Sequence, residues 1–328
     1  MKYGSRKQKK RKAGKVMRTV LLCLAAFLAG SALLNGICCA VEKDSIRYGQ
    51  KIKTDGGTMC VETYGSGKNV VVVLPGSGNC SPVLDFRYLA DLLSEECTVV
   101  VPEPFGYGLS DITDKERTFE NIAQEIHQCM SELGYRSYTL MGHSISGITM
   151  LEYANRYPDE VNAVIALDTS VPKQIREYTE TMKFLSVFTD RVFRVLRGTG
   201  IVRLYFEAGG TYGISQGSMT DEEFDTYKRI AYARLCNRNI IEELECFLNT
   251  DALRMFDMTY PDSVPVLTFL AEDSTAQIPV WEQLHRELTS NENSATEILT
   301  GGHYVYQFHP EEIAEKTLGF INSGSLWR

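Results

Sequence analysis

The sequence lacks the usual marks of a metal, redox or nucleotide site. No Cys-x-x-Cys pair occurs outside residues 19–41, and no cluster of His and Cys has the spacing of a zinc site. The Gly-rich stretch PGSGNC at 75–80 lacks the Lys and the Ser or Thr that complete a phosphate-binding loop. These absences argue against a zinc site and against a nucleotide-binding loop.

Acidic residues are missing from the first 41 positions. Residues 1–18 carry nine Lys or Arg, and residues 19–41 carry no charge at all. At about 1.5 Å per residue, that uncharged run is long enough to cross a hydrocarbon core of roughly 30 Å. Because a basic flank stays in the cytoplasm, the sequence predicts a cytoplasmic tail (1–18), a transmembrane signal-anchor (19–41) and a domain outside the cell membrane. The alternative is a cleaved signal peptide, with Cys38-Cys39-Ala40 as a loose cleavage site.

The rest of the chain has a deficit of positive charge. The net charge of −8 becomes −17 once the nine basic residues of 1–18 are removed (−8 − 9). A domain this acidic is a poor partner for a polyanion, so nucleic acid is excluded as an expected ligand. Six cysteines lie outside the apolar run, and their spacing does not decide between disulfides and small buried residues.

The chain from residue 46 alternates between strand and helix patterns. Continuous β-branched runs such as NVVVVL (69–74) end in Gly-rich loops and are followed by amphipathic stretches, including one expected helix over 83–93. This pattern predicts a mostly parallel sheet with helices on both faces. It covers 46–172 and resumes over 262–323, whereas 173–261 is entirely helical in pattern and predicts a cap inserted between the two parts of the sheet. Aromatic residues of that insert either line an acyl pocket or pack in the core: Phe184, Phe188, Phe193, Tyr205 and Tyr212.

Ser144 stands at a corner between a strand and a helix. The apolar run at 138–141 reads as a buried strand, and apolar residues at helical spacing begin at Ile145. The corner reads Gly-His-Ser-Ile-Ser-Gly (142–147), in which the Gly and Ser residues are small. This is the geometry of a nucleophile elbow, in which a sharp turn exposes the serine hydroxyl.

Four segments in this order resemble the α/β-hydrolase family, in its branch with a helical cap. They are LPGSG (74–78), FGYGLSD (105–111), GHSIS (142–146) and GGHYVYQFHPEEIAEKTLGFI (301–321). The resemblance runs from about residue 46 to the C-terminus and implies an eight-stranded, mostly parallel sheet flanked by helices. The chain departs from the family at Ser146, which stands where a second Gly is usual, and at Pro75, which replaces a His.

The resemblance implies a Ser-His-Asp triad that works without a cofactor. Ser144 takes the position of the nucleophile, and His303, after the last strand, takes that of the base. The family's usual position for the acid falls on Ser274 in this chain. The acid therefore stays open between Asp273, which a one-residue loop shift would bring into place, and Asp168, at the end of VIALD as in haloalkane dehalogenases, with Glu272 or no acid at all as the remaining alternatives. The backbone N–H groups of Ile145 and Ser77 are the expected oxyanion donors.

The sequence therefore predicts a membrane-anchored serine esterase that cleaves a small acyl substrate through an acyl-enzyme. A serine nucleophile argues against dehalogenase and epoxide hydrolase chemistry, for which the family uses Asp. A peptidase or thioesterase of the same fold, and a non-catalytic binding or sensory domain on this scaffold, remain the alternatives.

Overall fold

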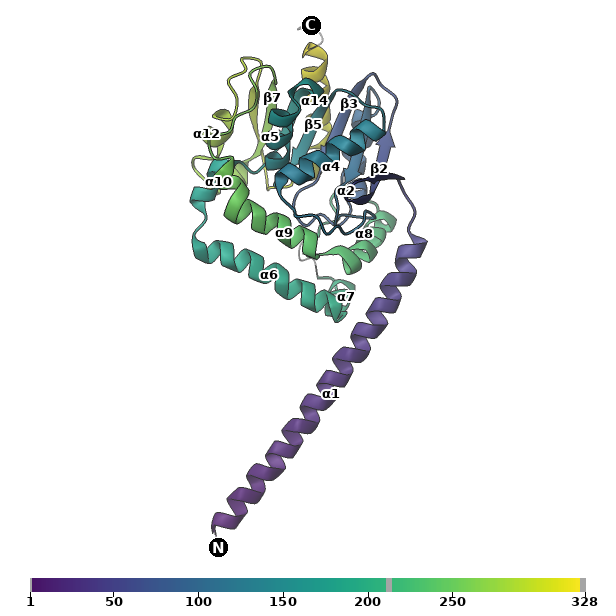
Figure 1. The fold of residues 1–328 in the computed structure, drawn as a ribbon, viewed down its shortest axis with the longest axis vertical. Helices are drawn as coiled ribbons and strands as arrows, with labels where there is room; N and C mark the ends of the chain where they lie inside the picture. Colours follow the sequence, from purple (N-terminus) through teal and green to yellow (C-terminus); the bar gives the residue numbers. More distant parts are fainter. Residues whose placement is uncertain (1, 211–213, 325–328) are drawn as a thin grey trace.

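A computed structural model describes residues 2–210 and 214–324, and its centre is one eight-stranded sheet (Figure 1). The strand order is β1-β2-β4-β3-β5-β6-β7-β8; β2 pairs antiparallel with β1 and β4, and the other neighbours are parallel. The strands are β1 (Gln50–Thr54), β2 (Gly57–Tyr64), β3 (Asn69–Leu74), β4 (Cys97–Glu103), β5 (Tyr138–His143), β6 (Val161–Leu167), β7 (Val266–Ala271) and β8 (Ala295–Leu299). The predicted fold class is confirmed.

Helices cover both faces of the sheet because its central strands are apolar on both sides. Val71 and Val73 of β3 pack in one buried cluster with α2, α3 and α14, whereas Val72 and Leu74 pack in another with α4 and α5. These helices are α2 (Pro82–Asp85), α3 (Arg87–Leu93), α4 (Phe119–Glu132), α5 (Ser146–Arg156) and α14 (Pro310–Gly324). The single helix expected over 83–93 is wrong in detail, because the chain breaks at Phe86 into α2 and α3.

A group of helices lies between β6 and β7 in the chain, and we call α6 to α10 the cap. Its α6 and α9 run below the sheet in Figure 1. The cap comprises α6 (Glu180–Gly198), α7 (Ile201–Glu207), α8 (Asp221–Arg234), α9 (Arg238–Cys246), the π-helical turn η3 (Phe247–Asp251) and α10 (Ala252–Arg254). The short elements around it are η1 (Pro158–Glu160), η2 (Pro172–Glu177), α11 (Glu272–Gln277), α12 (Trp281–Arg286) and α13 (Val305–Phe308).

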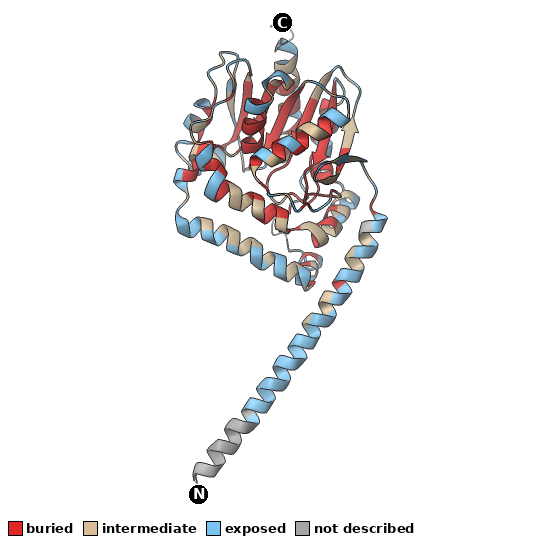
Figure 2. Cartoon of the chain, viewed as in Figure 1, coloured by how far each residue is buried: buried red, intermediate tan, exposed pale blue. Residues whose placement is uncertain are grey.

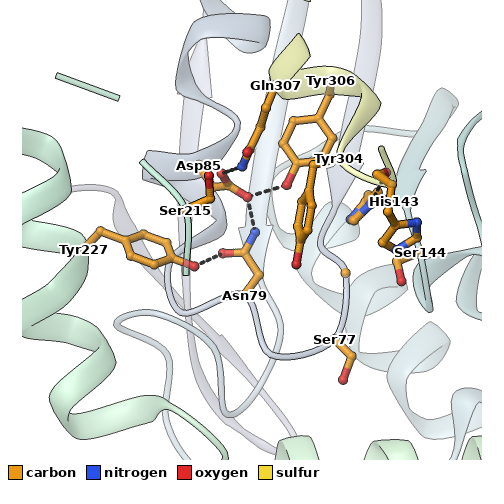
Figure 3. Close-up of a pocket in the computed structure, with 12 residues that line it drawn as sticks. Ser77, Asn79, Asp85, His143, Ser144, Ser215, Tyr227, Tyr304, Tyr306 and Gln307 are labelled. Atoms are coloured by element: carbon orange, nitrogen blue, oxygen red, sulfur yellow. Dashed lines mark hydrogen bonds between the residues drawn. The ribbon is translucent and has the colours of Figure 1, made fainter. Parts of the chain in front are cut away.

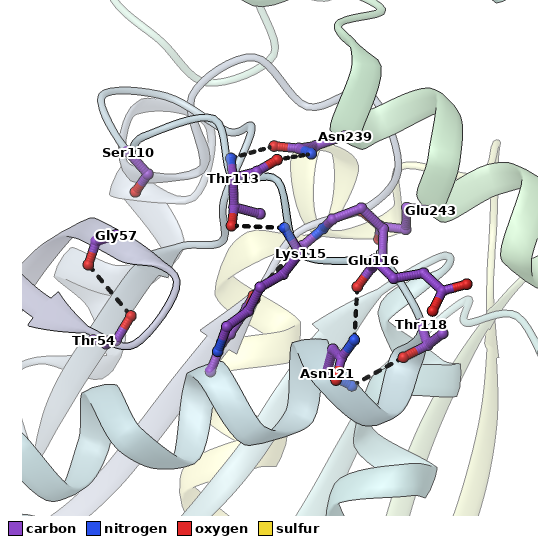
Figure 4. A network of polar contacts seen from close by, with 12 residues as sticks. Thr54, Gly57, Ser110, Thr113, Lys115, Glu116, Thr118, Asn121, Asn239 and Glu243 are labelled. Carbon is purple, nitrogen blue, oxygen red and sulfur yellow. Dashed lines mark hydrogen bonds and ion pairs between the residues drawn. The ribbon is translucent and has the colours of Figure 1, made fainter.

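One buried amide joins the cap to the loop that follows β4. Asn239 of α9 accepts a hydrogen bond from the backbone N–H of Thr113 (2.9 Å) and donates one to the Thr113 carbonyl (2.9 Å), as Figure 4 shows. The Asn239 side chain is fully buried. Because a buried amide that is fully paired stabilises one arrangement, this pair fixes α9 against the sheet domain.

A long N-terminal helix, α1 (Lys2–Ser45), leaves the sheet domain and runs past the cap (Figure 1). Its segment Gly14–Glu42 contains an 18-residue window with a mean hydropathy of 2.2, and only 6% of that window is buried. By length and composition this segment is able to cross a membrane.

Candidate active site

Ser144 occupies a strained turn between β5 and α5. Its φ is 55°, in the left-handed region that a residue with a side chain rarely adopts. The turn is held by its own carbonyl, which accepts hydrogen bonds from the backbone N–H groups of Gly147 (3.0 Å) and Ser170 (2.7 Å). The side chain is partly exposed although both neighbours, His143 and Ile145, are buried. This is the exposure that the sequence predicted for an elbow serine.

The small residues around Ser144 are required by close approach. A Cβ on Gly147 would lie 2.4 Å from the Ser170 carbonyl oxygen, and a Cβ on Gly142 would lie 2.5 Å from Ser146 Oγ. Ser146 fits where the family has Gly because its hydroxyl donates to the His143 carbonyl (2.8 Å) within the same turn. The departure at Ser146 therefore leaves the corner intact.

His303 makes a short hydrogen bond with Asp168. Its Nδ1 donates to Asp168 Oδ2 over 2.6 Å. Asp168 directly follows β6, while His303 follows β8, so the contact joins side chains 135 positions apart. The carboxylate is fully buried, and the imidazole is 41% exposed.

Asp168 is held by four donors. Oδ2 accepts from His303 and from Ser274 Oγ (2.6 Å), and Oδ1 accepts from Trp281 Nε1 (2.8 Å) and the Ala271 N–H (3.1 Å). Burial alone would raise the pKa of this carboxyl, but the hydrogen bonds from His303, Ser274 and Trp281 and the His303 charge outweigh it and hold the pKa below its usual range. Asp168 thus stays ionised in a buried position.

Asp273, the other carboxylate considered from the sequence, does not accept the hydrogen bond of His303 Nδ1. It is exposed in the first turn of α11, and its backbone N–H donates to the Gly301 carbonyl (3.1 Å). The hydrogen bond of His303 Nδ1 goes to Asp168 instead. Of the two candidates, the structure brings Asp168 to His303.

The buried side chain of His143 contacts His303 through a hydrogen bond and through its ring. Its Nε2 donates to the His303 carbonyl (3.1 Å), and the two rings lie 4.5 Å apart between centroids. Burial holds the pKa of His143 well below its usual range, with a smaller contribution from the His303 charge. A neutral His143 therefore fixes the backbone of the exposed imidazole.

The loop after β3 packs directly on the elbow. A Cβ on Gly76 would lie 2.6 Å from His143 Nδ1 and 3.1 Å from Ser144 Cβ. This approach brings the Gly76 backbone next to Ser144, while Ile145, the N-cap of α5, follows Ser144 in the chain. Ser77 lines the same pocket as Ser144, and the N–H groups of Ser77 and Ile145 remain the predicted oxyanion donors.

A polar pocket opens beside Ser144 (Figure 3), and its space is about 420 Å³ including the part open to solvent. At its far wall Asp85 accepts hydrogen bonds from Asn79 (2.6 Å), Tyr306 (2.5 Å) and Gln307 (2.7 Å). Burial raises the pKa of Asp85 to about 6, although these three donors oppose the shift. The lining residues are Gly76, Ser77, Asn79, Asp85, His143, Ser144, Ser215, Tyr227, His303, Tyr304, Tyr306 and Gln307.

The pocket offers no evident place for a metal ion. Among residues 2–210 and 214–324, no three His, Cys, Asp or Glu side chains gather as metal ligands would. The arrangement instead combines an exposed hydroxyl, a histidine with a buried carboxylate partner, and backbone N–H groups. Such groups serve nucleophilic attack on a carbonyl carbon.

Comparisons with known proteins agree with this geometry. The family model described as alpha/beta hydrolase fold matches residues 69–197. Haloalkane dehalogenase DbeA from Bradyrhizobium elkani superposes with a TM-score of 0.63 at 20% identity, covering 85% of this chain and 99% of its own. The chain has the α/β-hydrolase fold.

Two relatives of this chain are informative at the sequence level. The uncharacterized protein YbdG of Bacillus subtilis is 28% identical over 83% of this chain and 85% of its own length. Human serine hydrolase BPHL is 29% identical over 35% of this chain and 40% of its own. Together with the family model, these matches support the α/β-hydrolase family and a hydrolytic enzyme.

Sequence reasoning missed three side chains around the candidate site. Ser274 and Trp281 donate to Asp168, and Asp85 forms the far wall of the pocket. Ser274 did carry a signal, because it stands where the sequence pattern placed the acid. No sequence signal marked Trp281 or Asp85, because each reaches the site only through the packing of distant elements.

Proposed function

We propose that the chain is a membrane-anchored serine hydrolase that cleaves a small polar ester or related acyl compound. The observation that carries the proposal is the Asp168–His303 hydrogen bond at the edge of the pocket that also holds Ser144. The name of the human relative, a serine hydrolase, supports the same reaction class. Eleven of the twelve lining residues carry a polar side-chain group, which favours a polar substrate over a long acyl chain.

The reaction begins with attack by Ser144 Oγ on the carbonyl carbon of the substrate. His303 Nε2 accepts the hydroxyl proton, while Asp168 keeps Nδ1 protonated and stabilises the imidazolium. The carbonyl oxygen becomes an oxyanion, and the N–H groups of Ile145 and Ser77 donate hydrogen bonds to it. When the tetrahedral intermediate collapses, the leaving alcohol takes the proton from His303 and the acyl group remains on Ser144.

Water completes the cycle. His303 removes a proton from the water as it attacks the acyl carbon, and a second tetrahedral intermediate forms. Its collapse breaks the bond to Ser144 Oγ, which recovers the proton from His303, and the carboxylic acid leaves. Asp273 has no part in this sequence, and no cofactor is needed.

The membrane anchor is the second part of the proposal. The uncharged run at 19–41 lies within α1, and the basic residues that precede it favour a cytoplasmic tail and a hydrolase domain on the outer side. Resistance of the full chain to alkaline extraction from membranes tests the anchor. Release at alkaline pH would instead indicate a cleaved or peripheral form.

Labelling of the full chain by a fluorophosphonate tests the nucleophile. We expect the wild type to be labelled and Ser144→Ala to lose all label. Ser146→Ala is the matched control, because it removes a neighbouring hydroxyl that bonds only to backbone carbonyls. A folded wild type that takes no label, judged by a cooperative thermal transition, would contradict the proposal and leave a binding domain as the better explanation.

A further inference from the structure

The cap carries a broad apolar surface that no described segment covers. Its α6 has no buried residue at all, and Figure 2 shows this helix in the colours of exposed and intermediate residues. We call this surface the cap apolar face. Its members are all at least 36% exposed: Met182, Phe184, Leu185, Phe188, Val192, Val195, Ile201, Leu204 and Tyr205.

The exposed aromatics correct one expectation from the sequence. Phe184 (64% exposed), Phe188 (51%) and Tyr205 (44%) do not line the pocket and are not in the core. Phe193 packs at the edge of a buried cluster, and Tyr212 lies outside the described residues. A large exposed apolar surface on a folded domain typically marks an interaction site.

The helix α1, which contains the apolar run 19–41, is also bonded to the cap next to the cap apolar face. Ser31 Oγ donates to the Thr199 carbonyl (2.7 Å), and Asn35 Nδ2 donates to the Arg197 carbonyl (3.0 Å). Arg203 of α7 forms a two-armed ion pair with Glu42, with both N–O distances at 2.7 Å. The junction of α6 and α7 is therefore fixed against residues 31–42 of α1.

The contact between α1 and the α6–α7 junction determines how deep in the bilayer the cap apolar face would lie. A hydrocarbon core of roughly 30 Å takes about 20 helical residues, so a span beginning after Arg18 ends near residue 38. Ser31 and Asn35 lie inside this range, and Glu42 lies just beyond its outer end. The cap residues bonded to them stand at the level of the outer leaflet, where an exposed apolar side chain meets lipid.

The part of the cap that carries this face is less acidic than the rest of the domain. Residues 179–207 carry five basic side chains, Lys183, Arg191, Arg194, Arg197 and Arg203, against the three acids Glu180, Asp190 and Glu207, a net charge of +2 (5 − 3). The chain from residue 19 onward has a net charge of −17 (−8 − 9). Arg191 and Arg203 pair with Glu245 and Glu42 outside the segment, so this part of the cap is close to neutral in an otherwise acidic domain. A helix that is amphipathic and does not repel an acidic surface is suited to a membrane interface.

We propose that α6 and α7 lie in the outer interface of the bilayer that α1 spans, with the cap apolar face against the lipid. This inference rests on the anchor part of the proposed function and adds a second, in-plane membrane contact. The cap is then held on the membrane while the polar pocket faces water-soluble substrates. A second copy of the chain is the competing occupant of the same face.

Tryptophan quenching by brominated lipid tests the contact in the full chain. The protein is reconstituted into vesicles of phosphatidylcholine and phosphatidylglycerol, with bromine on the acyl chains, and the emission of Phe188→Trp is compared with the wild type. Ile298→Trp is the matched control, because Ile298 is 48% exposed but lies on the edge strand β8 of the sheet domain. We expect strong quenching of the emission added by Phe188→Trp and none of that added by Ile298→Trp.

Flotation of the same vesicles separates the two proposals. If the chain floats with the vesicles but Phe188→Trp is not quenched, the anchor stands and the interface contact is wrong. Blue-shifted emission without quenching would assign the face to a second copy and would also overturn the inference. A chain that does not float contradicts both the anchor and this contact, while labelling of Ser144 is judged separately.

Discussion

His303 Nδ1 lies 2.6 Å from Asp168 Oδ2, and the two side chains differ sharply in exposure. Because the carboxylate can only accept a hydrogen bond, the proton of the neutral imidazole is on Nδ1. Nε2 is then the basic nitrogen, and it belongs to the ring that borders the pocket. A fully buried anion thus sets the tautomer of a histidine that is open to substrate.

Replacing Asp168 tests this relationship directly. In Asp168→Asn the amide has the size of the carboxylate but carries no charge, so it neither stabilises the imidazolium nor enforces the Nδ1–H tautomer. We expect kcat for a small chromogenic acetate ester to fall by about 10⁴-fold, the loss known for this change in the chymotrypsin-type triad.

Asp273→Asn is the matched control for that experiment. Its carboxylate is exposed on α11, and the His303 ring bonds to Asp168. We expect kcat to stay within about two-fold of the wild type, the range of an ordinary surface change. The reverse outcome, a large loss with Asp273→Asn and a small one with Asp168→Asn, would mean that the acid is Asp273.

The sequence could single out Ser144 and His303 as candidates because each depends on short-range features. An elbow needs only a strand, a tight turn with small residues and a helix, and all three lie within 138–156. The acid depends on a long-range feature. Since β6 and β7 are adjacent and parallel, both Asp168 and Asp273 come at the same edge of the sheet. What decides between them is that α11 begins at once after Ala271 and carries Asp273 outward.

The sequence predicts that the cap is helical, but it does not predict which side of each cap helix is packed and which is exposed. Aromatic and aliphatic residues at helical spacing describe equally a helix packed in a core and one that faces lipid. The distinction depends on which neighbours arrive, and here the neighbour is α1, whose Asn35 and Glu42 bond to the start and end of the α6–α7 junction. Contacts over more than 160 positions leave no local trace in the sequence.

Ser274 is expected to act as a positioning residue through Asp168. Ser274→Ala removes one hydrogen bond to an ionised group, which contributes about 1.5 kcal/mol or more, so kcat should fall by about ten-fold. KM should stay unchanged, because Ser274 does not line the pocket. Steady-state kinetics with the same ester provide the measurement.

Two further variants serve as controls for the loss of kcat expected in Ser274→Ala. Ser274→Thr keeps the hydroxyl and should restore most of the rate. Thr275→Ala removes a hydroxyl from the same helix that bonds only to the Ala271 carbonyl, and it should leave kcat near the wild-type value. Equal losses for Ser274→Ala and Thr275→Ala would point to general damage to α11 and against a role for the bond to Asp168.

The Ser77 N–H is expected to bind the oxyanion. Ser77→Pro removes this donor, and the loss of one such donor typically lowers kcat by about 10²- to 10³-fold. Ser77→Ala retains the N–H and should keep a rate within about three-fold of the wild type. Similar losses for both variants would assign the effect to the Ser77 hydroxyl.

Asp85 is expected to make the stability of the fold depend on pH. Its pKa of about 6 in the folded protein exceeds the value of about 3.9 expected for the unfolded chain. Between these values the folded state holds a proton that the unfolded state has lost, so the free energy of unfolding falls as the pH rises from about 4 to about 6. A difference of two pKa units corresponds to about 3 kcal/mol, present at pH 4 and lost above pH 6.

Asp85→Asn removes this titration. Any fixed cost of the amide, such as poorer bonding to Asn79 or Gln307, is the same at both pH values and cancels in the comparison. The fall in Tm between pH 4 and pH 7 should therefore be smaller in Asp85→Asn than in the wild type, by roughly 5–10 °C. The buried Glu243, whose pKa burial raises to about 7, contributes equally to both proteins. Asp91→Asn, at an exposed position of α3, should follow the wild type; if Asp85→Asn does so too, Asp85 is not the group that titrates.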